Sequence, residues 1–273
     1  MSNILVIPDI HHKTRIADAI LSAPLEHRVD YTVFLGDYFD DFGDTPLTST
    51  KTAEWLKESL TKPNRIHLMG NHDLHYRYWR HEYMQNPWTG WTIEKARAIN
   101  NVLTPEDWDK LKWFHYEPDG NWLFTHAGLH PGILPPINND AGELKINNAL
   151  ISACANANRA LEAGDNHPLF RAGRARGGEQ SVGGLVWLDW NEEFIPFEFH
   201  QVVGHTPVRE PQVCFYDEEQ KRFRYGNARE TMPCKGASSP LTTLIHTCII
   251  VQLSTETASV FIKSRTFSPR HNA

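Results

Sequence analysis

The stretch Ile4-Leu-Val-Ile-Pro-Asp9-Ile-His11 decides the fold class of this 273-residue chain. Its aliphatic half is typical of a buried β-strand, and the Asp and His that follow mark the point where the strand leaves the core. Two later runs repeat this pattern, and apolar side chains recur at helical spacing in both intervals between the runs. The runs are residues 31–35 and 65–69, and the intervals are residues 15–23 and 48–60. This alternation predicts an α/β fold that starts with a parallel sheet and right-handed crossovers.

Five short polar segments end apolar runs of this kind, the last two runs being residues 122–125 and 201–203. Open α/β sheets place ligands at the carboxyl ends of their strands, so we expect the segments to meet at one sheet edge. They must then belong to a single domain, which we expect to cover residues 1–273. The segments are Asp9-Ile-His11, Gly36-Asp37-Tyr-Phe-Asp40, Gly70-Asn71-His72-Asp73, Thr125-His126-Ala-Gly128 and Gly204-His205-Thr-Pro207.

The side chains of these segments suit two metal ions. An Asp and a His two residues apart can bind one hard or borderline cation, and the Asp37 carboxylate can bridge that cation to a second one. Two-metal hydrolases hold their ions roughly 3.5 to 4 Å apart, which requires such a shared ligand. The predicted ligands are Asp9, His11 and Asp37 for the first ion, and Asp37, Asn71, His126 and His205 for the second. This donor set suits manganese, iron, zinc, cobalt or nickel.

The composition narrows the environment and the partners. With 27 Lys and Arg against 33 Asp and Glu, the chain has no global basic field, so nucleic acid is a possible partner but not a favoured one. No run approaches the ~18 apolar residues of a membrane span. The four cysteines show no Cys-x-x-Cys spacing, which argues against disulfide bonds and thiolate zinc sites. We expect a soluble, cytoplasmic protein without a membrane partner, and its oligomeric state stays open.

In this order the five segments resemble the calcineurin-like metallophosphoesterase superfamily, and most closely its phosphoprotein phosphatase branch with bacterial and phage members. The resemblance covers about residues 3–210 and is strongest at His126-Ala-Gly-Leu-His-Pro131 and Val203-Gly-His205-Thr-Pro207. It implies a four-layer αββα sandwich, in which two mixed β-sheets are flanked by helices. It also implies a cofactor of two divalent or trivalent metal ions, with Mn²⁺ favoured over iron, zinc, nickel or cobalt.

The resemblance further implies a hydrolase that cleaves phosphate esters by attack of a hydroxide that bridges the two metal ions. His72, beside the ligand Asn71, would donate the proton to the leaving oxygen. Asp40 would orient that imidazole, since a carboxylate partner stabilises the imidazolium form. As substrate, we expect the phosphate ester of a nucleotide or small molecule rather than a phosphoprotein.

Two positions depart from the pattern of this branch. Pro207 stands where many superfamily members have a further metal-binding His. Asp41 stands where the branch has the Arg that clamps the substrate phosphate, and an acid there would repel a phosphomonoester dianion. Either other cations hold the phosphate, or the substrate is a less charged diester. The candidate substrate-binding residues are His12, Arg77, Arg174 and Arg176.

The remaining segments predict additions around this site. An aromatic-rich insertion covers about residues 74–118, and its rings can form either a lid that stacks a nucleobase or a small satellite core. Further helices are expected from Thr104 and over residues 147–163. The C-terminal part is expected to hold a hairpin of residues 213–216 and 222–225, a second strand pair of residues 247–253 and 259–263, and a loose tail from about residue 264.

Three kinds of function fit these features. The favoured one is a metal-dependent phosphoesterase that acts on a nucleotide or small molecule. A phosphodiesterase or nuclease, or a dinucleoside polyphosphate hydrolase, is the enzymatic alternative, and Asp41 suits the less charged diester among these substrates. A non-enzymatic scaffold could keep the fold and a metal ion, but it has no reason to keep His72 beside Asn71.

Overall fold

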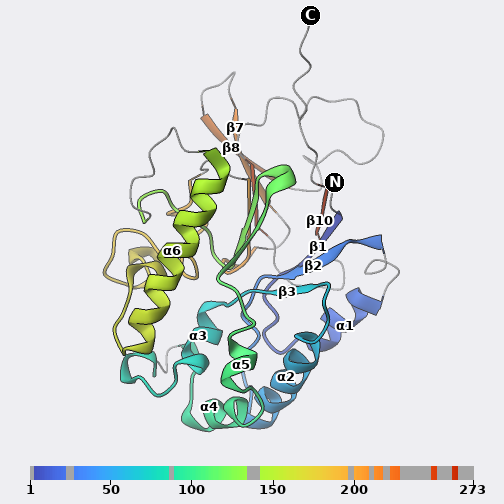
Figure 1. Ribbon diagram of the computed structural model, residues 1–273, viewed down its shortest axis with the longest axis vertical. Coiled ribbons are helices and arrows are strands. Elements are labelled where there is room, and N and C mark those ends of the chain that lie inside the picture. Colours follow the sequence, from blue (N-terminus) through green and yellow to red (C-terminus); the bar gives the residue numbers. More distant parts are fainter. Residues whose placement is uncertain are drawn as a thin grey trace, which may run out of the picture.

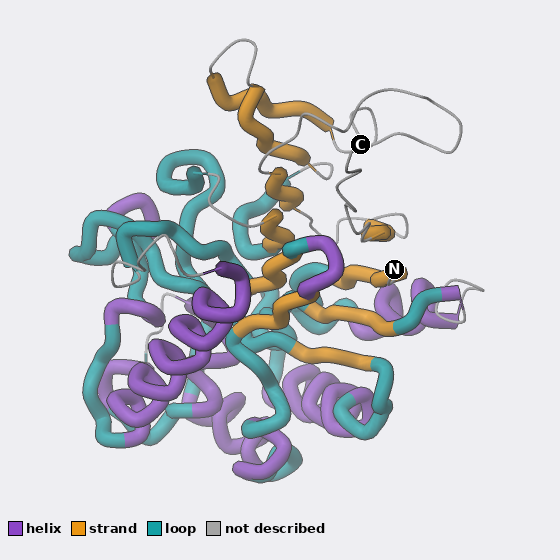
Figure 2. Tube along the Cα trace, turned by 45° about the horizontal axis from the view of Figure 1, so that its top comes forward, coloured by secondary structure: helices purple, strands orange, loops and turns teal. Residues whose placement is uncertain are grey.

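The computed structural model describes residues 3–22, 28–85, 89–133, 142–195, 200–208, 212–217, 222–227, 247–250 and 260–263. The strands among them form two mixed β-sheets (Figure 1). Helices α1 and α2 lie beside the first sheet, and α6 lies on the side of the second (Figure 1). Figure 2 shows that the lower strands lie beside the helices, whereas several strands at the top of the view lie apart from them. This arrangement confirms the predicted α/β class with two mixed sheets and flanking helices.

The first sheet begins as the sequence predicts. β1 pairs in parallel with β2, and β2 pairs in parallel with β3, with helices α1 and α2 as the crossovers. Helix α2 begins where the Thr45 side chain accepts the backbone N–H of Thr48 and Pro46 occupies the first turn. The bounds are β1 (Asn3–Ile7), α1 (Thr14–Ser22), β2 (Tyr31–Phe34), α2 (Pro46–Ser59) and β3 (Arg65–His67).

The second sheet has the strand order β4-β5-β6-β9-β7-β8. β5, β6 and β9 run parallel to one another, whereas β4 and β7 run antiparallel to their neighbours. β7 and β8 form the hairpin that the sequence predicts. The bounds are β4 (Phe114–Glu117), β5 (Trp122–Thr125), β6 (His200–Val203), β7 (Gln212–Asp217), β8 (Arg222–Asn227) and β9 (Thr247–Ile250).

The predicted pairing of residues 247–253 with residues 259–263 is wrong. β9 pairs with β6 and β7 in the second sheet, whereas β10 (Val260–Lys263) pairs antiparallel with β1 in the first. Two apolar runs in succession favour a hairpin only if no other strand competes for them. Here each run finds a partner in a different sheet, and β10 pairs the edge of β1 that would otherwise be open. The predicted loose tail from about residue 264 lies outside the described residues.

Alternating side chains of the first strand serve two different cores. Ile4 and Val6 point into the space between the sheets, where they pack in one cluster with Phe124 of the second sheet. Leu5 and Ile7 point to the other face and join the large cluster that the helices cover. All four aliphatic side chains are fully buried. A strand that is apolar on both faces is therefore explained by the sheet's position inside the sandwich.

The aromatic-rich insertion is largely helical and packs on this large cluster. Helix α4 lies against α2, and helix α5 begins at the predicted place, where Thr104 and Asp107 form a capping box. Tyr76 and Tyr78 are buried in the cluster. These two rings therefore act as core residues. The bounds are α3 (Asn71–Arg77), α4 (Ile93–Asn100), α5 (Pro105–Trp108) and α6 (Gly142–Glu162), the last of which contains most of the predicted helix over residues 147–163.

Two further observations concern the composition. Within the described part of the chain, Cys154 and Cys214 are buried free thiols. No helix that the structure describes combines the length and the apolar character needed to cross a bilayer.

Candidate metal centre

The carboxyl ends of the strands meet at one place, where two groups of side chains converge. In the first group, one ligand atom each from Asp9, His11 and Asp37 lies within 4.8 Å of the other two. In the second group, Asp37, His126 and His205 satisfy the same limit of 4.8 Å. Asp37 belongs to both groups, which is the arrangement that two ions with a shared ligand require.

Asn71 completes the second group. Its Oδ1 lies 3.0 Å from Nε2 of His126. That Nε2 atom lies 3.3 Å from Oδ2 of Asp37 and 3.2 Å from Nδ1 of His205. The structure thus brings all the residues predicted as metal ligands together, and their role as ligands stays a prediction.

Close backbone approaches bring the strand ends together. A Cβ atom on Gly70 would lie 2.1 Å from Oδ1 of Asp37, and a Cβ atom on Gly204 would lie 2.1 Å from Oδ1 of Asp9. Only glycine fits at Gly70, because a Cβ there would also lie 2.4 Å from the backbone nitrogen of Asp37, whereas a Cβ at Gly204 would displace the Asp9 carboxylate. The residues of this region with a left-handed backbone are His11 (φ 40°), His12 (φ 61°), Asp37 (φ 50°), Asp40 (φ 66°) and His205 (φ 66°). Residues other than glycine adopt this backbone conformation at a cost in free energy, and such residues gather at functional sites.

Hydrogen bonds decide which nitrogen of each imidazole faces the cluster. The Nδ1–H of His11 donates to the carbonyl oxygen of Asp40 (2.6 Å), and the Nδ1–H of His126 donates to the carbonyl oxygen of Leu35 (2.9 Å). Because a carbonyl oxygen only accepts, Nε2 of both rings is left to face the Asp37 carboxylate. Metal-binding histidines are commonly oriented by a backbone partner of this kind.

The cluster concentrates negative charge that attracts a cation. Burial alone would lower the pKa of His126, but the charges of Asp37 and Asp9 raise it to about 9. Burial would raise the pKa of Asp37, yet His126 and His72 hold it well below its usual range. Carboxylates that stabilise a protonated imidazole so strongly also attract a metal ion. The ion binds to the imidazole by displacing its proton. The side chains present therefore fit the two metal ions that the sequence predicts.

His72 lies beside the cluster and is held by two carboxylates. Its Nδ1 lies 2.9 Å from Oδ2 of Asp40, and its backbone N–H donates to Oδ1 of Asp37 (3.0 Å). Burial alone would lower the pKa of His72, but Asp37 and Asp40 raise it to about 9. The ring centroid is 5.3 Å from that of His11. A protonated imidazole thus stands next to the predicted ligands of the first ion.

Comparison with known proteins identifies the family. Residues 2–229 match the model of the calcineurin-like phosphoesterase family. This chain belongs to that family. It is therefore a member of a phosphoesterase hydrolase family, as its sequence motifs predict.

Solved structures similar to this phosphoesterase share little sequence with it. A cold-active protein-tyrosine phosphatase of a psychrophilic Shewanella is 15% identical, with a TM-score of 0.44, over 76% of this chain and 66% of that one. A metallophosphoesterase from Sphaerobacter thermophilus is 18% identical, with a TM-score of 0.39, over 91% and 75% of the two chains. A putative diadenosine tetraphosphatase is 14% identical, with a TM-score of 0.40, over 96% and 93%. Comparison with curated proteins gave no match.

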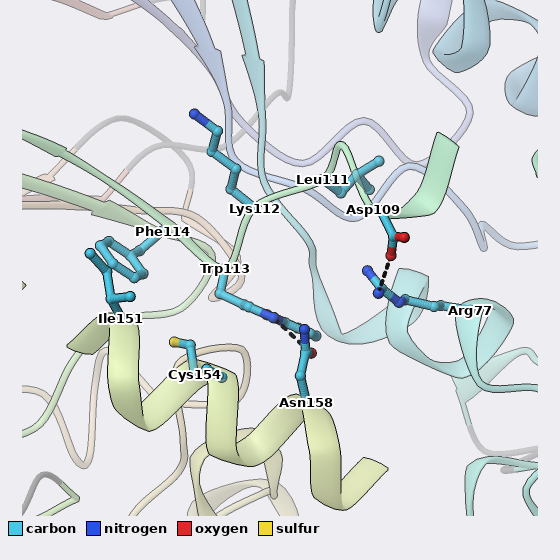
Figure 3. A pocket seen from close by; sticks show the side chains of 10 residues that line it. Arg77, Asp109, Leu111, Lys112, Trp113, Phe114, Ile151, Cys154 and Asn158 are labelled. Carbon is cyan, nitrogen blue, oxygen red and sulfur yellow. Dashed lines mark hydrogen bonds and ion pairs between the residues drawn. The ribbon is translucent and has the colours of Figure 1, made fainter. Parts of the chain in front are cut away.

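Two of the predicted substrate-binding residues of this phosphoesterase are engaged elsewhere. The His12 ring, 6% exposed, has Nδ1 2.8 Å from Oγ1 of Thr52 and Nε2 3.0 Å from Oδ2 of Asp44. Arg77 donates to the Asp109 carboxylate (2.7 Å) and lines a cavity of about 420 Å³ that none of the predicted ligands reaches (Figure 3). A nearby carboxylate engages each of the two side chains, and their roles in substrate binding stay predictions.

Two candidate arginines lie in the Gly-rich loop of residues 171–178, and Arg176 is the one near the cluster. It donates to Oγ1 of Thr206 (2.9 Å), and its Nε lies 2.8 Å from Oδ2 of Asp189. Burial, a neighbouring histidine and the Arg176 charge hold the pKa of His205 well below its usual range. Arg174 is exposed. Arg176 therefore stays a candidate for substrate binding at the second group.

The acid at the position of the expected phosphate clamp has a partner. Nζ of Lys13 lies 3.0 Å from Oδ2 of Asp41, and both side chains are more than one third exposed, at 36% and 40%. Nζ of Lys13 also lies 3.4 Å from the carbonyl oxygen of His11, a predicted ligand. The ion pair offsets the negative charge of Asp41, which weakens the repulsion that the sequence predicts for a phosphomonoester.

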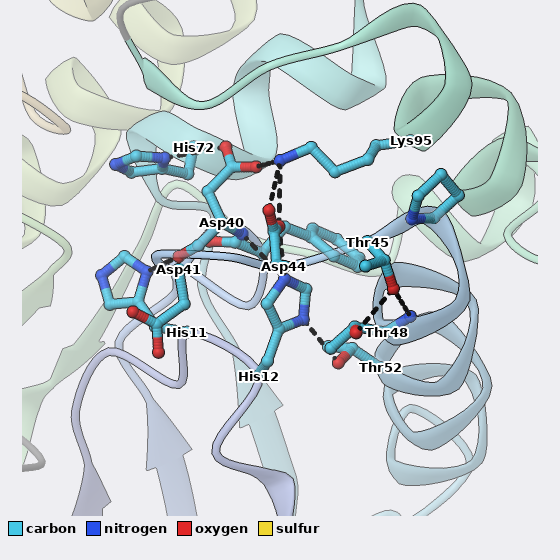
Figure 4. Close-up of polar contacts among 12 residues, drawn as sticks. His11, His12, Asp40, Asp41, Asp44, Thr45, Thr48, Thr52, His72 and Lys95 are labelled. Atoms are coloured by element: carbon cyan, nitrogen blue, oxygen red, sulfur yellow. Dashed lines mark hydrogen bonds and ion pairs between the residues drawn. The ribbon is translucent and has the colours of Figure 1, made fainter.

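Sequence reasoning missed Lys95 and Asp44. Nζ of Lys95 lies 2.6 Å from Oδ1 of Asp40 and 2.9 and 3.0 Å from the two carboxylate oxygens of Asp44 (Figure 4). Lys95 sits on the apolar stripe of α4, one turn before the buried Ile99. A lysine on the apolar face of an amphipathic helix is the one sequence signal that pointed to a buried ion pair.

Proposed function

We propose that this chain hydrolyses phosphate esters with the help of two metal ions. The observation that carries the proposal is the position of Asp37, which belongs to both groups of ligand side chains. The paired imidazole of His72 beside the first group adds to it. A scaffold protein with a structural metal site needs neither a shared carboxylate nor a protonated imidazole next to it. The arrangement therefore favours catalysis over a purely structural role.

The predicted ligands divide into two sets that share one carboxylate. Asp9, His11 and Asp37 would hold one ion, and Asp37, Asn71, His126 and His205 would hold the other. Ions bound there would supply water of lowered pKa and would neutralise charge on the phosphate oxygens. Mixed oxygen and nitrogen donors without a thiolate suit Mn²⁺, and also iron, zinc, nickel or cobalt.

His72 acts as the general acid in this proposal. Asp40 engages Nδ1, so Nε2 is the atom that donates a proton to the departing alcohol oxygen as its bond to phosphorus breaks. The Asp40 carboxylate supports the protonated form, because it accepts a hydrogen bond from Nδ1 of the ring. The proton donor is therefore oriented before the substrate arrives.

We assign the alcohol part of the substrate to a cavity of about 260 Å³ beside the second group. Trp187 lines this cavity, and its ring centroid is 5.7 Å from that of His205. Phe170, Arg171 and Arg176 also line it. Aromatic rings favour a planar ligand, and the two guanidinium groups, which pair with Glu179 and Asp189, favour polar atoms on it. This supports a nucleotide or small aromatic ester over a phosphoprotein.

A phosphodiesterase or dinucleoside polyphosphate hydrolase is the second candidate, and Asp41 favours the phosphodiesterase. A diester carries less charge than a monoester and tolerates an acid better at the clamp position. Lys13 offsets that charge only from an exposed position. The choice between the two candidates therefore depends on how strongly the site binds a dianionic phosphate.

Metal removal tests the proposal. After chelation and dialysis, hydrolysis of p-nitrophenyl phosphate and bis(p-nitrophenyl) phosphate should fall to background, and Mn²⁺ or Ni²⁺ should restore it. The ratio of the restored rates on the two esters distinguishes the monoesterase from the diesterase. Full activity after complete metal removal, or no hydrolysis of any phosphate ester with either metal present, would contradict the proposal.

A further inference from the structure

A buried cluster of charged side chains lies directly behind the pair of His72 and Asp40. At its centre is Lys95 of α4, which is 3% exposed. Figure 4 shows its Nζ between the carboxylates of Asp40 and Asp44, with His72 on the opposite side of Asp40. No predicted metal ligand belongs to this cluster, and Lys95 enters it from the insertion rather than from a strand end.

The two oxygens of Asp40 have different partners. Oδ2 lies 2.9 Å from Nδ1 of His72, whereas Oδ1 lies 2.6 Å from Nζ of Lys95 and accepts the hydroxyl of Tyr76. A carboxylate held at both oxygens cannot rotate without breaking one set of contacts. Lys95 and Tyr76 therefore fix the plane in which Asp40 meets the imidazole.

Asp44 holds Lys95 in that place. Both of its oxygens contact Nζ, and Oδ2 also lies 3.0 Å from Nε2 of His12. The buried ammonium thus faces two carboxylates, which offsets the cost of its desolvation. Such a buried ion pair is a weak source of stability, since apolar side chains of similar size often stabilise a fold as well or better. A role in orienting Asp40 explains the placement of Lys95 more directly.

We propose that Lys95 is a positioning residue, which holds Asp40 against His72 so that the imidazole is aimed at the leaving oxygen. The inference rests on the proposed phosphoesterase function and adds a residue to its proton-donating arm. Lys95 acts through Asp40 and does not touch the substrate. It also gives the insertion a part in the site, since α4 brings the ammonium to Asp40.

The test compares K95M with K57M on two esters. Lys57 of α2 also ties a helix to the insertion, by donating to the Val102 carbonyl (2.6 Å) and pairing with Asp107 (3.2 Å), but it has no contact with Asp40. In K95M, kcat for phenyl phosphate should fall by on the order of 10-fold, a part of the effect of a general acid. The fall for p-nitrophenyl phosphate should be smaller, because p-nitrophenolate is a better leaving group than phenolate and its departure depends less on protonation. KM and bound metal should stay unchanged.

The variants and the parent protein give results that either support or overturn the positioning role. K57M should lose some thermal stability while keeping kcat on both esters, and K95R should recover part of the rate on phenyl phosphate. Equal rate losses on both esters in K95M, or none, would overturn the positioning role while leaving the phosphoesterase function intact. If the parent protein hydrolyses only diesters, the same variants are compared on diphenyl phosphate and bis(p-nitrophenyl) phosphate. If it hydrolyses none of these esters with Mn²⁺ or Ni²⁺, the proposed function fails and the inference fails with it. Should K95M not fold, K95Q on the same two esters decides.

Discussion

Strand ends and connecting helices contribute to this site in different ways. The strand ends supply the predicted metal ligands, and Asp37 joins the two groups at the point where β2 stops. The helical insertion supplies Lys95, which reaches the site only through Asp40. A strand end is a fixed point on a sheet edge, whereas the place of a helical side chain depends on how the helix packs. Substitutions of the predicted metal ligands should therefore change metal binding and rate together, and substitutions of the other residues at the site should change only one property.

The largest effect is expected from D37N. An amide is a poor bridge between two cations, so both ions should bind weakly and the rate should fall by on the order of 10⁴-fold, because the ions supply nucleophile and charge neutralisation together. Metal content by mass spectrometry and kcat on p-nitrophenyl phosphate check this. D18N is the matched control, because Asp18 lies on α1 and only accepts the indole N–H of Trp55. A D37N protein with two bound ions and normal rate would break the comparison.

H72N should separate rate from metal binding. His72 is the proposed general acid and not a predicted metal ligand. Its loss should therefore leave the metal content unchanged while kcat falls by on the order of 10²- to 10³-fold, the range of a general acid. H167N is a suitable control, because His167 caps a short helix by accepting the Leu169 backbone N–H, which asparagine can also do. An H72N protein of normal rate would favour a scaffold that holds metal without using the imidazole.

The comparison also explains what sequence reasoning could find. The strand-end residues were predictable because an apolar run and the polar residue after it are adjacent in sequence, and parallel topology brings such points together. The partner of β10 was not predictable, because pairing with β1 joins residues about 260 positions apart that no local pattern links. The contacts of His12 were not predictable either, because its ring lies 2.8 Å from Thr52 and 3.0 Å from Asp44, which are 40 and 32 positions away.

Lys95 shows the same limit for side chains. Its contact with Asp40 spans 55 positions and depends on the packing of α4 against α2. No role was predicted for it, because its place on an apolar stripe is recognised only when the bounds of α4 are known. The arginines of the Gly-rich loop were proposed on composition alone, and composition does not distinguish Arg176, near His205, from the exposed Arg174.

The metal-free protein should lose stability as pH rises through the region where the cluster titrates. The pKa values of His72 and His126 are raised to about 9 in the folded chain, against 6.5 for an ordinary histidine. Both groups therefore contribute stability that is fully present below about pH 6.5 and is lost as the pH approaches 9. We expect a loss of about 1–3 kcal/mol between these limits.

Thermal unfolding of the chelated protein at pH 6, 7.5 and 9 measures this loss, and H126N is the matched variant. Bound metal replaces the protons as the source of positive charge, so the metal-loaded protein should depend on pH much less over the same range. A chelated protein that becomes more stable toward pH 9 would contradict the raised pKa values of His72 and His126.

The smallest effect is expected at the exposed pair of Lys13 and Asp41, which stands in a connecting loop. In K13M the Asp41 carboxylate loses its partner, and kcat/KM for a phosphomonoester dianion should fall by about two- to five-fold, the range of an exposed ion pair. The fall should be smaller for a diester and should shrink at high salt. D41N should raise the same constant, and the double variant should return it near the parent value. If K13M instead lowers the rate on monoesters as strongly as H72N does, Lys13 binds the phosphate directly, and the loop belongs to the site as fully as the strand ends do.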